Sequence, residues 1–154
     1  MFFTFLTRGS ASVQCAHVSK KKDEVTNDRF RSASAYESLV GFSRAVRRGS
    51  RILVSGTAPL DADGETVIGD AYAQAKRCFE IILEAVEALG GTRNDVVRTR
   101  MFVIDAADWD GVGRAHGEFF RDTYPAATLV VVKGLLDPRW RVEIEAEAEL
   151  LSSP

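Results

Sequence analysis

Four glutamates alternate with apolar residues in the last strand-like segment of the chain. They are Glu143, Glu145, Glu147 and Glu149, and Val142, Ile144, Ala146, Ala148 and Leu150 fill the positions around them. Side chains alternate between the two faces of an extended strand, so one face carries carboxylates spaced roughly 6 to 7 Å apart. Carboxylates this close repel one another unless water, cations or a ligand that needs an acid lies beside them. We therefore look for acid–base chemistry first on this strand.

Two arginine-rich segments contain cations that could neutralise this row. The segment SRAVRRGSR contains Arg44, Arg47, Arg48 and Arg51, and the segment VRTRMFVI contains Arg98 and Arg100. Arginine is a suitable partner because its planar guanidinium group binds a carboxylate through two parallel hydrogen bonds. For any one glutamate, a solvated or salt-bridged surface position is the plainer interpretation. A chemical role for one member of the row is the alternative.

The composition limits the classes of protein to which this chain can belong. Its 154 residues are 45% hydrophobic, which suits one domain with a substantial core. A balance of 20 basic and 22 acidic residues gives a net charge of −2, which disfavours nucleic acid as the principal partner. The two cysteines, Cys15 and Cys78, and the two histidines, His17 and His116, show no metal-binding spacing. Since glycine-rich nucleotide-binding motifs are also absent, we predict neither a metal nor a cofactor.

The first 28 residues differ from the rest of the chain because they show no hydrophobic periodicity. We predict an N-terminal extension over residues 1–28, either a leader or a flexible segment, and one domain over residues 29–154. The apolar opening is too short, and precedes the positive charges, for a secretory signal. An organellar transit peptide remains compatible with it. No apolar run approaches the roughly 20 residues that span a bilayer, so we expect a soluble, cytoplasmic protein without membrane contact.

Hydrophobic periodicity from Arg29 onward predicts the element order ββαβαββ. The expected strands are residues 42–46, 51–55, 97–104, 128–132 and 142–150, and the expected helices lie between Asp70 and Gly90 and between Asp108 and Pro125. Gly49 and Ser50 form the predicted hairpin turn. This order fits an α+β fold with the helices on one face of a mixed sheet. Because the other face would carry the charged residues, burial between subunits is expected.

From roughly Val40 to Leu150 the chain resembles the RidA/YjgF family of small trimeric proteins. The matching segments, in family order, are AVRRGSRILVSG at 45–56, QAKRCFEIILEAVEALGG at 74–91, VVRTRMFVIDAADW at 96–109, FFRDTYPAATLV at 119–130 and VEIEAEA at 142–148. The resemblance implies a chorismate-mutase-like α+β fold, with two helices on one face of a mixed sheet. It also implies a homotrimer with a small-molecule pocket between subunits.

The resemblance implies hydrolysis of small enamines and imines to a 2-oxoacid and ammonia, with Glu143 orienting the water. This reaction needs no metal or organic cofactor, because an iminium carbon is already electrophilic. In deaminating family members an arginine after a Pro-Ala pair clamps the substrate carboxylate. Ala127 occupies that position here. Because a desolvated contact of this kind contributes about 2 to 5 kcal/mol, we expect weak or absent activity on 2-iminopropanoate and 2-aminoacrylate.

The resemblance also implies further pocket positions, several of which depart from the usual family residue. They are Phe42, Ser55, Gly56, Thr57, His116 and Thr128, besides Ala127. Phe42 replaces a tyrosine, so it keeps the ring and loses the hydroxyl group, and Thr57 replaces a common glutamine. His116 also stands where a tyrosine is usual. Its imidazole suits proton transfer near neutral pH, but packing in the core is the plainer interpretation.

Three functional interpretations follow from these residues. The first is an imine or enamine hydrolase, and the second is a non-catalytic small-molecule-binding or regulatory trimer. A ribonuclease or translation inhibitor, as some relatives are described, has less support because no basic stripe with interleaved aromatic residues is present. An arginine pointing into the pocket would restore a site for a carboxylate. Without one, a neutral or cationic ligand would suit the pocket better.

Overall fold

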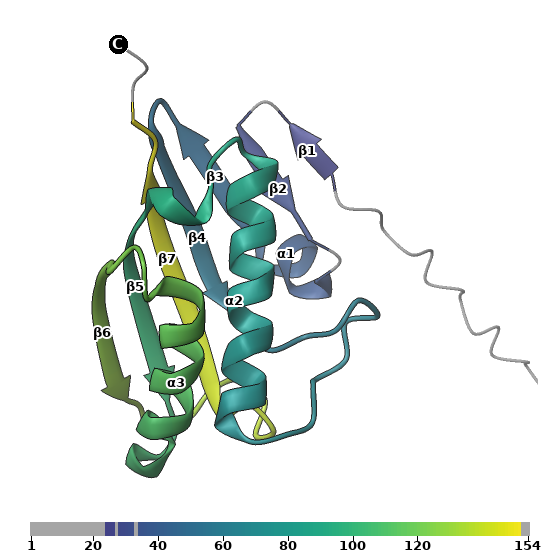
Figure 1. Cartoon of the computed structure of the whole chain (residues 1–154). Coiled ribbons are helices and arrows are strands. Elements are labelled where there is room, and N and C mark those ends of the chain that lie inside the picture. The colour runs from purple at the N-terminus through teal and green to yellow at the C-terminus, as the bar shows by residue number, and fades with distance from the viewer. Residues whose placement is uncertain (1–23, 27, 33, 152–154) are drawn as a thin grey trace, which may run out of the picture.

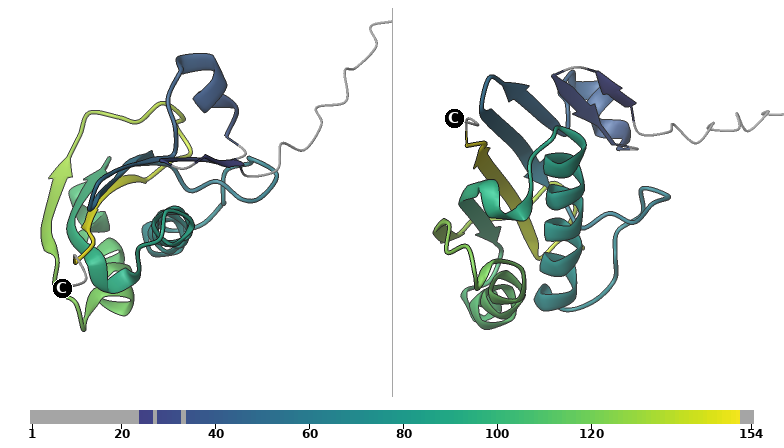
Figure 2. Two further views of the ribbon diagram at one scale, coloured as in Figure 1. Left: turned by 90° about the horizontal axis from the view of Figure 1, so that it is seen from above. Right: turned by 45° about the horizontal axis from the view of Figure 1, so that its top comes forward.

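The structure, a computed structural model, describes residues 24–26, 28–32 and 34–151 and consists of one mixed sheet with helices on both faces. The seven strands are β1 (Glu24–Thr26), β2 (Arg29–Arg31), β3 (Ala45–Arg48), β4 (Arg51–Thr57), β5 (Val96–Val103), β6 (Ala126–Val131) and β7 (Val142–Glu149). The helices are α1 (Ala35–Val40), α2 (Ala71–Ala88) and α3 (Trp109–Phe120), and short 3-10 turns cover Arg93–Asp95 and Ala106–Asp108. Helices α2 and α3 cover one face of the sheet, and α1 lies on the opposite face (Figures 1 and 2).

The strand order places the C-terminal strand inside the sheet. The order is β1-β2-β3-β4-β7-β5-β6, and every neighbouring pair is antiparallel except β5 and β6. The pairing of β4 with β7 is irregular between Val54 and Thr57, so Ser55 and Gly56 lie at a break in the ladder. Strand carbonyls at such a break need other hydrogen-bond donors.

Helix α2 provides most of the core on its side of the sheet. Its N-cap, Asp70, accepts a hydrogen bond from the backbone N–H of Ala73 at 2.8 Å, and the chain leaves the helix through Gly90 with a positive φ of 86°. The fully buried residues of its apolar stripe include Ala75, Cys78, Phe79, Ile82, Ala85 and Val86. This stripe confirms the helix that the sequence predicts.

Strand β7 has the two-faced character that its sequence indicates. Residues Val142, Ile144, Ala146 and Ala148 are buried, whereas the glutamates between them are only partly buried. The apolar residues belong to the core beneath α2 and α3. The glutamates therefore lie on the face that carries α1.

The predicted order ββαβαββ matches β3 to β7, but three N-terminal elements were not predicted. Strand β1 pairs with β2, with Val25 opposite Phe30, and lies within the range that the sequence suggested as an extension. Residues 1–23 of that range lie outside the described residues. The expectation of two helices on one face omits α1, whose six residues are too few to show helical periodicity. Among the described residues, no helix has the length and apolar character needed to cross a bilayer.

Candidate functional site

A cavity of about 420 Å³ lies on the face of the sheet that carries α1. Its wall is formed by α1, the segment between α1 and β3, the break in β4, the beginning of β7 and two loops. The apolar and aromatic residues of the wall include Tyr36, Val40, Phe42, Leu60, Leu136 and Trp140. The polar side chains of the lining include Arg44, Ser55 and Glu143. A largely apolar cavity with a few polar groups is typical of small-molecule sites.

Glu143 lies at the start of β7 and packs directly over Gly56. A Cβ atom on Gly56 would collide with Oε1 of Glu143, so only glycine leaves room for this carboxyl group. Burial raises the pKa of Glu143, the charge of Arg44 opposes that shift, and Glu145 adds to it. No ion pair within 4 Å joins Glu143 to any other described residue. The carboxyl group is therefore available to a ligand in the cavity.

The other three glutamates of the row are held by arginines on neighbouring strands. Arg100 of β5 bridges Glu145 at 2.8 Å and Glu147 at 3.0 Å. Arg51 of β4 lies 2.9 Å from Glu147 and 3.7 Å from Glu149. The salt-bridged interpretation is confirmed for these three glutamates. Glu143 is thus the member of the row that faces the cavity.

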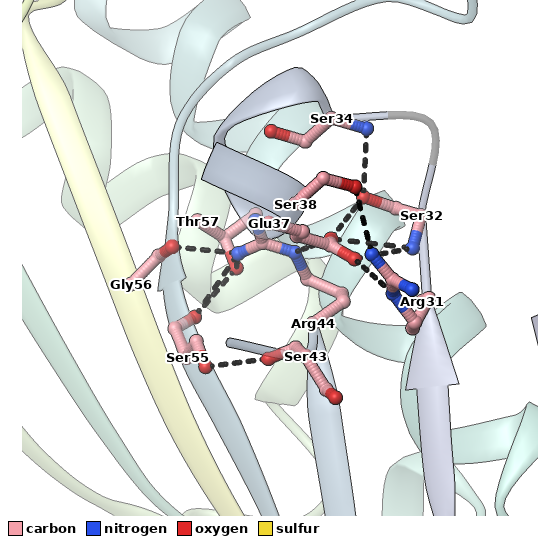
Figure 3. A network of polar contacts seen from close by, with 10 residues as sticks. All are labelled: Arg31, Ser32, Ser34, Glu37, Ser38, Ser43, Arg44, Ser55, Gly56 and Thr57. Atoms are coloured by element: carbon pink, nitrogen blue, oxygen red, sulfur yellow. Dashed lines mark hydrogen bonds and ion pairs between the residues drawn. The ribbon is translucent and has the colours of Figure 1, made fainter. Parts of the chain in front are cut away.

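Arg44 places a positive charge beside Glu143. This arginine is buried, with only 5% of its surface exposed. Its Nη1 atom donates hydrogen bonds to the backbone oxygen of Gly56 at 2.6 Å and to Oγ1 of Thr57 at 3.0 Å (Figure 3). A longer contact of 3.4 Å reaches the backbone oxygen of Ser55. Arg44 therefore donates hydrogen bonds to the carbonyls at the break in β4. These bonds stabilise the strand conformation against which the Glu143 carboxyl group packs. Burial lowers the pKa of Arg44, and Glu37 and Glu143 oppose that shift.

Glu37 of α1 is the buried counterion of Arg44. Its Oε1 atom lies 3.6 Å from Nε of Arg44 and accepts a hydrogen bond from the Ser32 hydroxyl at 2.6 Å. The backbone N–H of Ser32 donates to both carboxylate oxygens, and Arg31 lies 3.9 Å away (Figure 3). These contacts hold α1 over the cavity, since Tyr36 and Val40 of the same helix line it.

In the sequence, Arg44 is only one of several cations that could neutralise the glutamate row, and Glu37 was not predicted. The position of Arg44 could have been inferred from the predicted hairpin turn. With Arg48 opposite Arg51 and Ala45 opposite Val54, the hairpin register places Arg44 beside Ser55. For Glu37 no such signal exists, because a helix of six residues gives no pattern.

The structure brings together four of the predicted site residues. Phe42, Ser55, Gly56 and Glu143 all line the cavity. Thr57 is 1% exposed and lies behind the guanidinium group of Arg44, outside the lining. Its hydroxyl donates to the backbone oxygen of Ser55 at 2.8 Å, so the geometry favours a positioning role.

The remaining predicted residues lie away from the cavity in the single chain. Nε2 of His116 lies 2.9 Å from Oγ1 of the buried Thr99, and its ring packs against Phe79 and Phe120 between α2, α3 and the sheet. Burial lowers the pKa of His116, so this environment favours the packing interpretation. Ala127 and Thr128 lie on the edge strand β6, which β5 and β7 separate from β4.

The described residues form no group of three or more His, Cys, Asp or Glu side chains arranged to hold a metal ion. Cys78 is fully buried in the core, and burial raises the pKa of its thiol. This thiol is therefore kept protonated and away from the cavity.

Comparison with known proteins identifies the family. Residues 32–150 match the family model described as Endoribonuclease L-PSP. An uncharacterized protein of Streptomyces coelicolor is 41% identical over 120 residues, which cover 78% of this chain and 90% of that protein. A RutC family protein of Pyrococcus abyssi is 35% identical over 95 residues, covering 61% of this chain and 75% of that protein.

Solved structures give the same result for the fold. The crystal structure of Rv2704 from Mycobacterium tuberculosis, a member of the YjgF/YER057c/UK114 family, superposes with a TM-score of 0.71 at 38% identity. It matches 78% of this chain and 96% of its own. RidA from the Antarctic bacterium Psychrobacter sp. PAMC 21119 has a TM-score of 0.71 at 28% identity, covering 84% of this chain and all of its own. The chain belongs to the RidA/YjgF family.

Proposed function

We propose that the chain is a hydrolase of small imine and enamine metabolites, a deaminase, with Glu143 as the residue that handles water. The observation that carries this proposal is the position of the Glu143 carboxyl group. It is half-buried against Gly56, faces a cavity and lacks an ion pair among the described residues, whereas its three neighbours on β7 are all salt-bridged.

The chemistry of this site requires one proton acceptor and one electrophile. The carboxylate of Glu143 accepts a proton from water while the water oxygen bonds to the iminium carbon. The resulting carbinolamine receives that proton on nitrogen. Glu143 then accepts the proton of the hydroxyl group as the C–N bond breaks, ammonia leaves and the carbonyl group forms. A raised pKa brings Glu143 nearer to a neutral working pH, which favours both transfers. The electrophilic iminium carbon makes a metal or organic cofactor unnecessary.

The substitution at Ala127 limits the range of substrates. Arg44 keeps a cation in the cavity, but its Nη1 atom and its charge are already engaged by backbone oxygens and Glu37. It therefore does not reproduce a free, two-pronged carboxylate clamp. Activity on 2-aminoacrylate and 2-iminopropanoate is expected to be weak or absent. A rate equal to that of an arginine-bearing relative would contradict this expectation.

The proposal includes assembly into a homotrimer with pockets between subunits. The sheet face that carries the glutamates also exposes Leu53 at 44% and Val130 at 43%, and such apolar residues favour burial against another copy. Since Ala127 and Thr128 do not reach the cavity of their own chain, their predicted role requires the β6 strand of a neighbouring subunit.

The alternative is a trimer that binds a small molecule without transforming it. The missing arginine at Ala127 favours this alternative. The family model's description suggests a ribonuclease, but the net charge of −2 gives little attraction for RNA.

The test is hydrolysis of imines released from amino acids by an amino-acid oxidase in the presence of catalase. We expect the wild-type protein to accelerate formation of the 2-oxoacid beyond the spontaneous rate. Glu143→Gln should remove about 100-fold or more of that acceleration, since general acid–base catalysis contributes on this scale. Ligand binding with no acceleration would favour the binding protein, and cleavage of RNA by the purified protein would favour the ribonuclease.

A further inference from the structure

Large apolar side chains form the mouth of the cavity, although they lie in contact with solvent. Leu136 is 82% exposed, Val40 is 69% exposed and Tyr36 is 40% exposed, and all three line the cavity. Exposed apolar residues grouped around a cavity are typical of a binding site. The wall continues inward to Phe42 and Trp140. The cavity therefore has an apolar side as well as the polar group formed by Glu143 and Arg44.

The apolar wall is held in place by contacts within the chain. Nε1 of the buried Trp140 donates a hydrogen bond to Oγ1 of Thr66 at 3.0 Å, and its ring meets Tyr36 edge-on at 6.2 Å. The amide group of Gln74 joins both loops that carry wall residues. It donates to the backbone oxygens of Val67 and Arg139 at 3.0 Å and 2.9 Å. A wall formed before the ligand arrives needs little ordering on binding.

The size and charge of the cavity indicate the kind of ligand. Its volume of about 420 Å³ lies in the range of sites for drug-sized molecules and exceeds what a three-carbon imine needs. Because the charge of Arg44 is shared with Glu37, the carboxylate of a substrate gains little from it. Most of the binding free energy must then come from contact between apolar groups.

We propose that the site selects imines and enamines of large apolar amino acids, those with an aromatic or branched aliphatic side chain. This inference rests on the proposed hydrolase function and specifies its substrate class. The side chain lies against Tyr36, Leu136 and Trp140, and the imine carbon lies beside Glu143. Selection arises because an extended apolar side chain fills the wall, whereas a methyl group leaves it in contact with water.

The test compares imines generated by one amino-acid oxidase from alanine, leucine and phenylalanine. We expect kcat/KM for the leucine and phenylalanine imines to exceed that for the alanine imine by about 10-fold or more, the scale on which apolar pockets discriminate. Leu136→Ala should lower kcat/KM for the two large imines by a larger factor than for the alanine imine. The matched control is Leu39→Ala, because Leu39 lies on α1, is 81% exposed and is not part of the lining.

The outcomes separate this inference from the proposed function. Equal kcat/KM for the three imines would overturn the selectivity and keep the hydrolase. Failure to accelerate any imine would overturn the hydrolase proposal. Binding of the 2-oxoacid products would then test whether the cavity selects large apolar side chains. In a Trp109→Phe background, fluorescence of Trp140 should report tighter binding of phenylpyruvate than of pyruvate by about 10-fold. Equal affinities for the two 2-oxoacids would overturn the inference.

Discussion

At the scale of single residues, the contact between Gly56 and Glu143 sets the position of the carboxyl group. Glu143, Glu145, Glu147 and Glu149 share one strand and one face, yet Arg51 and Arg100 neutralise the other three. Glu143 instead packs over a residue without a side chain and beside a cavity. Its environment, rather than its residue type, distinguishes it from the other three and supports the chemical role that we propose for it.

Substitution of Gly56 tests this contact. Gly56→Ala should displace the Glu143 carboxyl group, lower kcat for imine hydrolysis and destabilise the fold by about 1 to 3 kcal/mol, as overpacking does. Kinetics and urea denaturation measure both effects. The matched control is Gly113→Ala in α3, where a Cβ would meet nothing within 4 Å. There the alanine should raise stability by up to about 1 kcal/mol. Unchanged kcat in Gly56→Ala would contradict the importance of the contact.

The pKa of Glu143 predicts a pH dependence. Because burial raises this pKa in the folded protein above its ordinary value of 4.5, the folded state binds the proton more tightly than the unfolded state. The stabilising effect of that proton is present below the unfolded pKa and is lost as pH rises through the folded pKa. Glu143→Gln should therefore gain stability relative to wild type between pH 4 and pH 7. Urea denaturation at both values measures the difference, and a constant difference would contradict the shift.

At the scale of elements, α1 and the β3–β4 hairpin are joined by a buried ion pair. Glu37 is 1% exposed and Arg44 is 5% exposed. Arg44 also binds the carbonyls where the pairing of β4 and β7 is interrupted. The pair thus couples the helix that forms one wall of the cavity to the strand that carries Gly56.

Removing one charge of this pair tests the coupling. Glu37→Gln should destabilise the protein by about 3 to 5 kcal/mol, because it leaves the charge of Arg44 buried without its counterion. Urea denaturation measures the loss. Glu87→Gln, at an exposed position of α2, should change stability by less than about 0.5 kcal/mol. An equally small effect at Glu37 would show that nearby Arg31 and solvent compensate for the pair.

At the scale of the whole molecule, the features with a local sequence pattern could be predicted, and those that depend on long-range pairing could not. The alternation of residues 142–149 and the apolar stripe after Asp70 are local patterns, and β7 and α2 follow them closely. Elements β1 and α1 are too short for a pattern and depend on tertiary contacts. The same holds for the site, since Arg44 reaches Glu143 only through the strand order β3-β4-β7.

The assembly is tested by the mass of the protein in solution. We expect three copies of the 16.9 kDa chain, and Leu53→Asp on the glutamate face should reduce this mass and the hydrolase activity together. Sedimentation equilibrium measures the mass. The matched control is Ile68→Asp, at a position that is 77% exposed in the loop before α2. This variant should change neither the mass nor the hydrolase activity. A monomeric wild-type protein with full activity would contradict the trimer.

The most direct test of the central claim compares two glutamines on the same strand. Imine hydrolysis is measured for Glu143→Gln and for Glu149→Gln, whose side chains lie on one face of β7 at opposite ends. We predict that Glu143→Gln loses about 100-fold or more of the rate acceleration, while Glu149→Gln, which loses only contacts to Arg51 and Ser50, stays close to wild type. Equal rates for the two variants would contradict the role of Glu143.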